Sequence, residues 1–100
     1  TIPEDNFIKQ ANYKQFMAYK QLTKLIREKT QRKETIETKV LNLYEASNPS
    51  LYYVYEVLGD YYAAIQQIDT AITYWQKALT MPIPKQAEKV RIQQKINKNQ

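Results

Sequence analysis

Two carboxylates one helical turn apart, Glu56 and Asp60, come nearest to a chemically active pair in this sequence. Such a pair can exchange protons with a substrate, or bind a cation when further ligands converge on it. The chain has no histidine and no cysteine, which excludes imidazole-based triads, thiol nucleophiles and Cys/His metal sites. With no third ligand and no glycine-rich phosphate loop, we expect both carboxylates to lie on a solvated helix face.

The other candidate groups receive the same interpretation. Glu34 and Glu37 lie in a strongly polar stretch, and we expect them to be solvated. Ser47 and Ser50 flank Asn48-Pro49, where a hydroxyl more often serves a helix junction than acts as a nucleophile. We therefore predict no catalytic residue, no metal site and no cofactor, and no enzymatic activity for this segment by itself.

Helices must position these residues. One glycine in 100 residues argues against a β-rich fold, and apolar residues recur at helical spacing. We expect an all-α domain of four or five helices, at about residues 4–29, 34–46, 49–66, 68–80 and 84–97. No apolar run reaches the roughly 18–20 residues of a membrane span.

Apolar stripes indicate which helix faces are buried. On the first helix one stripe contains Phe7, Ile8, Ala11, Ala18, Tyr19, Leu22, Leu25 and Ile26, and a second contains Tyr13, Phe16 and Met17. On the second helix the stripe is Ile36, Val40, Leu43, Tyr44 and Ser47. The last helix has a weak stripe, in which Ile92 and Ile96 align while Val90 points elsewhere.

Residues 52–82 carry two spaced signatures. The first reads Tyr55-Glu56-Val57-Leu58-Gly59-Asp60-Tyr61-Tyr62, and the second reads Ala71-Ile72-Thr73-Tyr74-Trp75-Gln76-Lys77-Ala78, followed by Pro82. Together they resemble a tetratricopeptide repeat (TPR), a helix-turn-helix unit of about 34 residues. The departures are Gln66-Gln67 in place of a glycine turn, tyrosine for the opening tryptophan, and a closing proline one residue early.

The resemblance implies a stack of antiparallel hairpins. Residues 4–47 would form a degenerate hairpin, 49–82 the TPR-like hairpin and 84–98 a C-terminal capping helix, all within one domain of residues 1–100. The smallest side chains, at Gly59, Ala71 and Ala78, would lie at the helix crossing.

In TPR arrays the first helices of successive repeats line a groove that binds peptides or partner proteins. By this resemblance the partner-binding residues are Tyr53, Glu56, Asp60, Ala63 and Ala64. Such a groove would be mildly acidic and rich in tyrosine, which favours a basic or apolar partner segment. Lys and Asn do not occupy these positions, so capture of a C-terminal carboxylate is not implied. Tyrosines at helical spacing also serve as core and rim residues, and this alternative stays open.

The net charge of +5 is unevenly distributed. Residues 1–40 carry a net +4, residues 41–80 a net −3 and residues 81–100 a net +4. Because the basic residues alternate with Glu and Gln along amphipathic segments, we interpret them as solvated helix faces. This pattern argues against nucleic acid and anionic surfaces as partners, although Lys85, Lys89, Arg91, Lys95 and Lys98 make the last helix basic.

Two function classes remain, and a third, binding of nucleic acid or an anionic surface through the basic helices, depends on the charge alone. The first is a non-catalytic interaction or structural module whose partner is a protein, a peptide, the rest of its own polypeptide or a second copy. The second is an appendage of a larger enzyme, because Pro3-Glu4-Asp5-Asn6-Phe7 through Tyr13, followed by one TPR hairpin, resembles the C-terminal tail of bacterial amidases related to penicillin acyltransferase.

Overall fold

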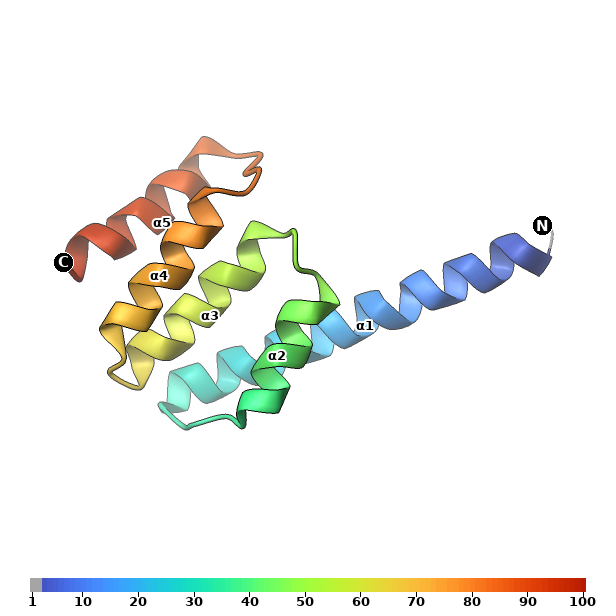
Figure 1. Ribbon diagram of the computed structural model, residues 1–100, viewed down its shortest axis with the longest axis horizontal. Helices are drawn as coiled ribbons and strands as arrows, with labels where there is room; N and C mark the ends of the chain where they lie inside the picture. The colour runs from blue at the N-terminus through green and yellow to red at the C-terminus, as the bar shows by residue number, and fades with distance from the viewer. Residues whose placement is uncertain (1–2) are drawn as a thin grey trace.

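The computed structural model describes the backbone of residues 3–100 and the side chains from Met17 onward. This part of the chain contains five helices and no strand: α1 (Pro3–Arg32), α2 (Thr38–Ser47), α3 (Tyr52–Ala64), α4 (Ile68–Leu79) and α5 (Gln86–Lys98) (Figure 1). The prediction of an all-α domain is therefore confirmed. None of the described helices is long and apolar enough to cross a membrane.

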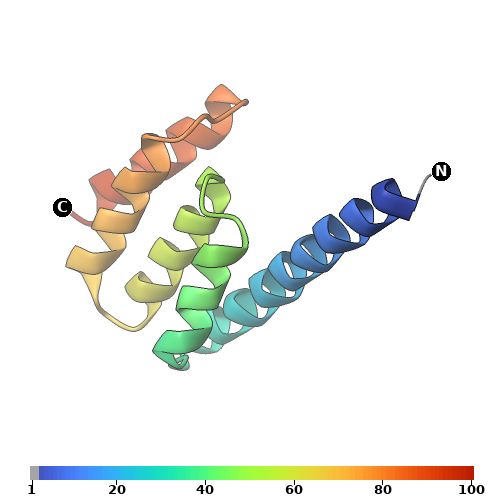
Figure 2. The same cartoon turned by 45° about the vertical axis from the view of Figure 1, so that its right-hand side comes forward.

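The helices alternate in direction. α1, α3 and α5 run one way, and α2 and α4 run back between them (Figures 1 and 2). α3 and α4 form the most extensive pair, α1 packs on α3, and α5 packs on α4. The N-terminal part of α1 projects beyond the other helices, which contributes to a longest dimension of 53 Å. The predicted stripe residues at 7, 8, 11, 13 and 16 lie outside the described side chains, as does the amidase-like segment.

The core follows the second hairpin. Buried apolar side chains gather where α3 meets α4, with further contributions from α1, α2 and α5: Ile26, Leu41, Tyr44, Tyr52, Val54, Tyr55, Val57, Leu58, Tyr61, Ala71, Trp75, Ala78, Ile92 and Ile96. Burying a large apolar side chain contributes about 1.5–3 kcal/mol, so this cluster provides most of the driving force for folding.

Gly59 lies at the closest approach of α3 and α4. A Cβ atom at this position would lie 2.4 Å from both Cδ1 and Nε1 of Trp75. The side chain that requires a glycine at position 59 is therefore the Trp75 indole. The repeat signature predicts that Ala71 and Ala78 face Gly59 instead. Both alanines are fully buried in the same core. The glycine has a packing purpose, but a large side chain uses the space that it leaves.

The turn between α3 and α4 closes without a glycine. Gln66 adopts a left-handed conformation with φ of 68°, its N–H donates to Ala63 O at 3.1 Å, and the Gln67 N–H donates to Tyr62 O at 2.9 Å. These are the two hydrogen bonds of a Schellman motif, which usually has glycine at the left-handed position. Lys33 (φ of 57°) ends α1 with the same pair of bonds.

Three local expectations are wrong. Leu43 on α2 is 60% exposed, whereas Leu41, absent from the predicted stripe, is buried. α2 begins only at Thr38, and its buried residues are Leu41 and Tyr44. α3 begins at Tyr52 and not at Pro49, with Leu51 as its N-cap residue, and Asn48 is the C-cap residue of α2.

Candidate functional site

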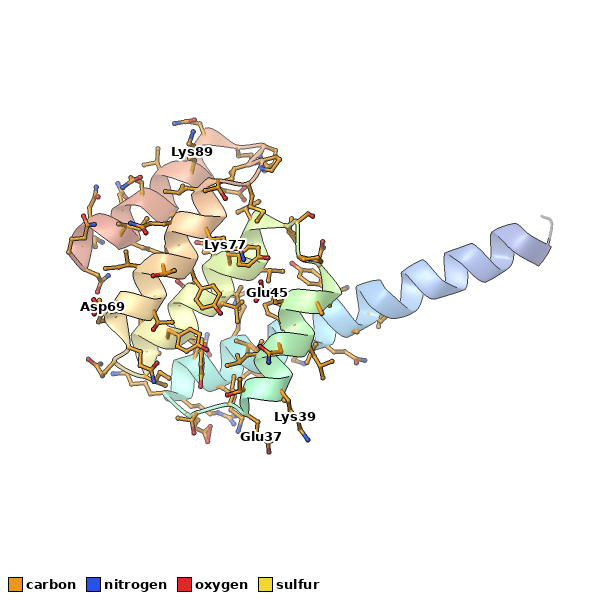
Figure 3. All side chains as sticks on the ribbon, viewed as in Figure 1. Glu37, Lys39, Glu45, Asp69, Lys77 and Lys89 are labelled. Atoms are coloured by element: carbon orange, nitrogen blue, oxygen red, sulfur yellow. The ribbon has the colours of Figure 1, made fainter. Side chains whose placement is uncertain are left out.

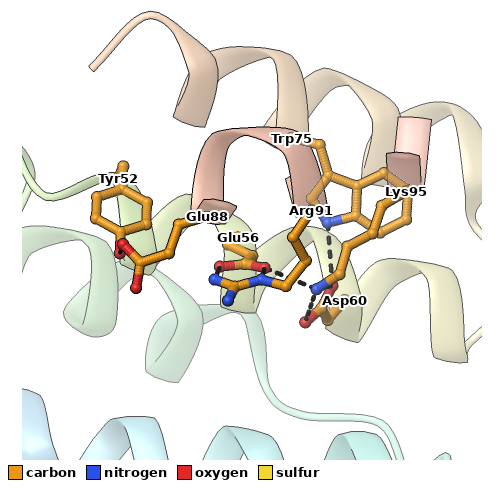
Figure 4. Close-up of polar contacts among 7 residues, drawn as sticks. All are labelled: Tyr52, Glu56, Asp60, Trp75, Glu88, Arg91 and Lys95. Carbon is orange, nitrogen blue, oxygen red and sulfur yellow. Dashed lines mark hydrogen bonds and ion pairs between the residues drawn. The ribbon is translucent and has the colours of Figure 1, made fainter. Parts of the chain in front are cut away.

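The most tightly bonded polar group of the molecule is the carboxylate of Glu56, on the face of α3 that α5 covers. Glu56 is 2% exposed. Arg91 of α5 donates two hydrogen bonds to this carboxylate, from Nε to Oε2 at 2.8 Å and from Nη2 to Oε1 at 2.7 Å (Figure 4). Lys95 Nζ adds a third bond to Oε2 at 2.8 Å. Such a bidentate, charge-assisted arrangement is the strongest kind of side-chain hydrogen bonding in proteins.

Lys95 continues the network to Asp60. Its ammonium lies 2.9 Å from Asp60 Oδ1 and 3.0 Å from Oδ2, and so it bridges the two carboxylates of α3. The Trp75 indole N–H of α4 donates to the same Oδ1 at 3.1 Å. The contact between Gly59 and Trp75 thereby positions Asp60, because the indole that fills the space above the glycine also orients the carboxylate.

The two carboxylates respond to this environment in opposite directions. Burial alone would raise the pKa of Glu56, but the hydrogen bonds and positive charges of Arg91 and Lys95 hold it below its ordinary value of 4.5. Burial raises the pKa of Asp60, and Lys95 offsets this only in part. Glu56 is therefore held as a carboxylate by two cations, which makes it a structural anion and a poor proton acceptor.

The interpretation of Glu56 as a solvated residue is wrong, and Arg91 and Lys95 are likewise not simply part of a solvated basic face. Their partners lie 35 and 39 positions away in the chain, a separation at which no local periodicity reveals pairing. Tyr52 extends the α3–α5 contact by donating a hydrogen bond from its hydroxyl to Glu88. Burial and this neighbouring carboxylate raise the pKa of Tyr52 to about 12.

The first hairpin repeats the geometry of the second with different residues. Trp75 of α4 lies against Gly59 of α3, and Tyr44 of α2 takes the same place against Thr23 of α1. Tyr44 hydrogen-bonds Thr23 Oγ1 at 2.9 Å and stacks on Tyr19, with ring centroids 5.8 Å apart. Because Tyr19 precedes Thr23 as Tyr55 precedes Gly59, α1 is the counterpart of α3.

This equivalence identifies which α1 residues share a face with the predicted site. Counting from Thr23 as from Gly59, Lys20 corresponds to Glu56, Lys24 to Asp60 and Arg27 to Ala63. We call the surface that these positions form on α1, α3 and α5 the first-helix face. Its residues are Lys20, Lys24, Arg27 and Glu28 on α1, Tyr53, Glu56, Asp60, Ala63 and Ala64 on α3, and Arg91 and Lys95 on α5.

A depression of about 360 Å³ runs along the α1 part of this face. Its described lining residues all come from α1, at intervals that follow one side of the helix: Tyr19, Lys20, Thr23, Lys24, Arg27, Glu28 and Gln31. Lys24 and Arg27 are exposed and have no carboxylate within ion-pair distance in the described part of the chain. The cations of α5 are thus bound to α3, whereas these two cations of α1 face solvent.

The five predicted partner-binding residues are separated into two groups by the structure. Glu56 and Asp60 face α5 and are bound by it, while Tyr53, Ala63 and Ala64 are half-buried on α3. Tyr53 packs against the same core as Tyr19, which lines the depression. Binding by these residues stays a prediction, but the expected acidic groove is corrected, because α5 balances both carboxylates.

The opposite side of the second hairpin is closed by aromatic stacking. Tyr74 of α4 stacks on Tyr55 and on Tyr62 of α3, with centroids 6.4 and 5.4 Å apart. Lys77 lies 4.7 Å above the Tyr55 ring and 3.3 Å from Glu45 of α2, toward which it points in Figure 3 (Figure 3). These contacts tie α2 to the second hairpin.

Glu34, Glu37 and Ser47 make the kinds of contact that the sequence predicts. Glu34 and Glu37 are exposed and make only long surface ion pairs, of 3.7–3.8 Å, with neighbouring cations. Ser47 donates its hydroxyl to Tyr44 O at 2.6 Å, as expected at a helix junction. Among the described residues, no group of three or more acidic side chains is arranged to hold a metal ion.

Comparisons with known proteins give no match: no family model, no curated protein and no solved structure resembles the chain closely enough to be counted.

Proposed function

We propose that the chain is a non-catalytic interaction module that binds a peptide segment of a partner protein along its first-helix face. The observation that carries this proposal is the depression of about 360 Å³ beside α1. It is lined by the exposed cations Lys24 and Arg27, which make no ion pair among the described residues, and by Tyr19, which packs on the same core as Tyr53. A tyrosine at such a border supplies contact area together with a polar tip, a combination enriched in protein interfaces.

The remainder of the structure supports a rigid platform. α5 is fixed to α3 by the Arg91 and Lys95 bonds to Glu56, and α4 is fixed by the Gly59–Trp75 contact. A binding surface held by packed helices loses little conformational freedom when a partner docks. The resemblance to TPR proteins, which bind peptides on the corresponding helix face, agrees with this assignment.

A peptide-display selection on the full chain tests the proposal. Selected peptides should bind the native chain and lose at least tenfold in affinity to the variant Tyr53→Ala/Ala64→Arg, which removes a rim contact and obstructs the face. The control Leu43→Ala/Gln76→Arg likewise truncates one large side chain and adds one arginine, on exposed residues of α2 and α4. Circular dichroism should show that both variants are folded. Failure to select any peptide, or equal loss in both variants, would refute the proposal.

A further inference from the structure

The charge of the first-helix face differs from one helix to the next. Lys20, Lys24 and Arg27 on α1 are basic, Glu56 and Asp60 on α3 are acidic, and Arg91 and Lys95 on α5 are basic. The two acidic groups are within 3.0 Å of cations of α5. The two inner charges are therefore cancelled, and the surplus positive charge of the face lies on α1.

The α3–α5 contact shows what a basic pair of this spacing binds in this fold. Arg91 and Lys95, one helical turn apart, engage two carboxylates that are also one turn apart. Lys24 and Arg27 on α1 likewise lie about one helical turn apart on the same side of the helix. A ligand carrying carboxylates at matching intervals would find on α1 the kind of counterpart that α3 finds on α5.

We propose that the partner segment is acidic, and that its side-chain carboxylates lie in the depression beside α1, against Lys24 and Arg27. This inference depends on the proposed function and names the chemistry of its ligand. It reverses the preference expected from the sequence, which was for a basic or apolar segment. Charge complementarity carries the argument, because Lys24 and Arg27 are exposed, line the depression and make no ion pair among the described residues.

The depression favours a peptide over other anions. Tyr19 and Thr23 form its inner wall and Gln31 its far end, so it presents apolar and hydrogen-bonding surface as well as cations. Glu28 also lines it and would repel a continuous line of phosphates more strongly than it repels carboxylates placed at intervals. Nucleic acid and anionic membranes therefore serve as competing outcomes in the test.

The test measures fluorescence anisotropy with three labelled peptides of about ten residues, long enough to pass all three cations at roughly 3.3 Å per residue. One carries Glu at regular intervals among Ala, Leu and Tyr; the second has Gln, and the third Lys, in place of each Glu. The acidic peptide should bind at least about tenfold more tightly than the Gln peptide, and its affinity should fall as salt is added.

Two variants with equal charge change locate the contact. Lys24→Glu/Arg27→Glu should weaken binding of the acidic peptide by at least tenfold. The control Lys39→Glu/Lys89→Glu changes exposed residues of α2 and α5, both visible in Figure 3, and should change the affinity less than twofold. Equal loss in both variants would show that only overall charge matters and would overturn the inference.

The remaining outcomes separate the inference from the proposed function. If the Gln or Lys peptide binds as tightly as the acidic one and loses affinity to Tyr53→Ala/Ala64→Arg, the interaction module stands and the acidic preference is wrong. If a single-stranded oligonucleotide or a vesicle containing anionic lipid binds more tightly and displaces the acidic peptide, the partner is not a peptide. If display selection yields no peptide at all, the proposed function fails together with the inference.

Discussion

α3 and α1 present equivalent positions on one face and use them in opposite ways. On α3, Glu56 is 2% exposed and bonded to two cations. On α1, the equivalent stretch holds Lys24 and Arg27, both exposed and without an ionic partner in the described residues. The position of a residue in the repeat therefore does not by itself make it a binding residue. The neighbouring helix determines whether its charge forms an ion pair within the fold or faces a ligand.

The largest effect should come from the buried side of this comparison. Glu56→Ala removes the carboxylate that neutralises Arg91 and Lys95, and breaking a buried ion pair typically costs about 3–5 kcal/mol. Part of this cost is relieved because Arg91 is 45% exposed, so we expect about 3 kcal/mol less free energy of unfolding in urea. Lys24→Ala on α1 should change it by no more than about 0.5 kcal/mol. Equal effects would remove the distinction between the two helices.

The two hairpins differ again at Gly59 and Thr23. Gly59→Ala gains about 1 kcal/mol in helix propensity but drives a Cβ atom into Trp75, and overpacking of this kind costs about 1–3 kcal/mol. We expect a net loss of about 1 kcal/mol in thermal or urea unfolding, reduced when Trp75→Leu is added. Thr23→Ala should cost about 1 kcal/mol, the value of a lost hydrogen bond to Tyr44. An unchanged melting temperature for Gly59→Ala would contradict the packing described here.

Alkaline pH should loosen the α3–α5 contact. The pKa of Tyr52 is raised in the folded state from 10 to about 12, so its contribution to stability is complete below pH 10 and lost as pH rises toward 12. We expect stability to decline over this window by about 1–2 kcal/mol more in the native chain than in Tyr52→Phe, measured by urea unfolding at each pH. Tyr52→Phe isolates the effect of this one hydroxyl, because the variant keeps all the other core tyrosines. Identical pH profiles would mean that Glu88 does not hold the Tyr52 hydroxyl.

The smallest effect should be a gain. Gln66 and Lys33 both adopt left-handed conformations that glycine tolerates at lower cost. Gln66→Gly should therefore stabilise the second hairpin by about 0.5–1 kcal/mol, and Lys33→Gly should do the same for the first. Gln31→Gly, in the last turn of α1 and without a positive φ, is the control and should not stabilise. Stability that falls in Gln66→Gly would show that the turn is not of the Schellman type.

Local spacing was sufficient to predict much of this fold. Periodicity within single segments predicts the helices and the alignment of Ile92 with Ile96. The repeat signature predicts the close approach of two helices at Gly59. The sequence did not reveal that Arg91 and Lys95 bind Glu56, because that contact depends on α5 crossing back over α3. The start of α3 at Tyr52 was also missed, since Pro49 is acceptable both in a turn and at a helix start.

The same limit applied to the candidate site. The similarity to repeat positions predicts partner binding for Tyr53, Ala63 and Ala64. The charge pattern alone predicts only a solvated face for Lys24 and Arg27. To recognise Lys24 and Arg27, one must know which positions of α1 correspond to those of α3. The contact between Thr23 and Tyr44, the counterpart of that between Gly59 and Trp75, supplies this correspondence. No motif within α1 carries that register, because Thr23 replaces the glycine that marks it in α3.

Lysine reactivity, followed by mass spectrometry after brief treatment with an amine-directed reagent, tests the contrast between α1 and α3 most directly. Lys24 should be modified rapidly and become protected when the acidic peptide is bound. Lys95, enclosed by Glu56 and Asp60, should react slowly with or without the peptide. Equal modification of the two lysines in the free protein, or a bound peptide that leaves Lys24 unprotected, would contradict the account.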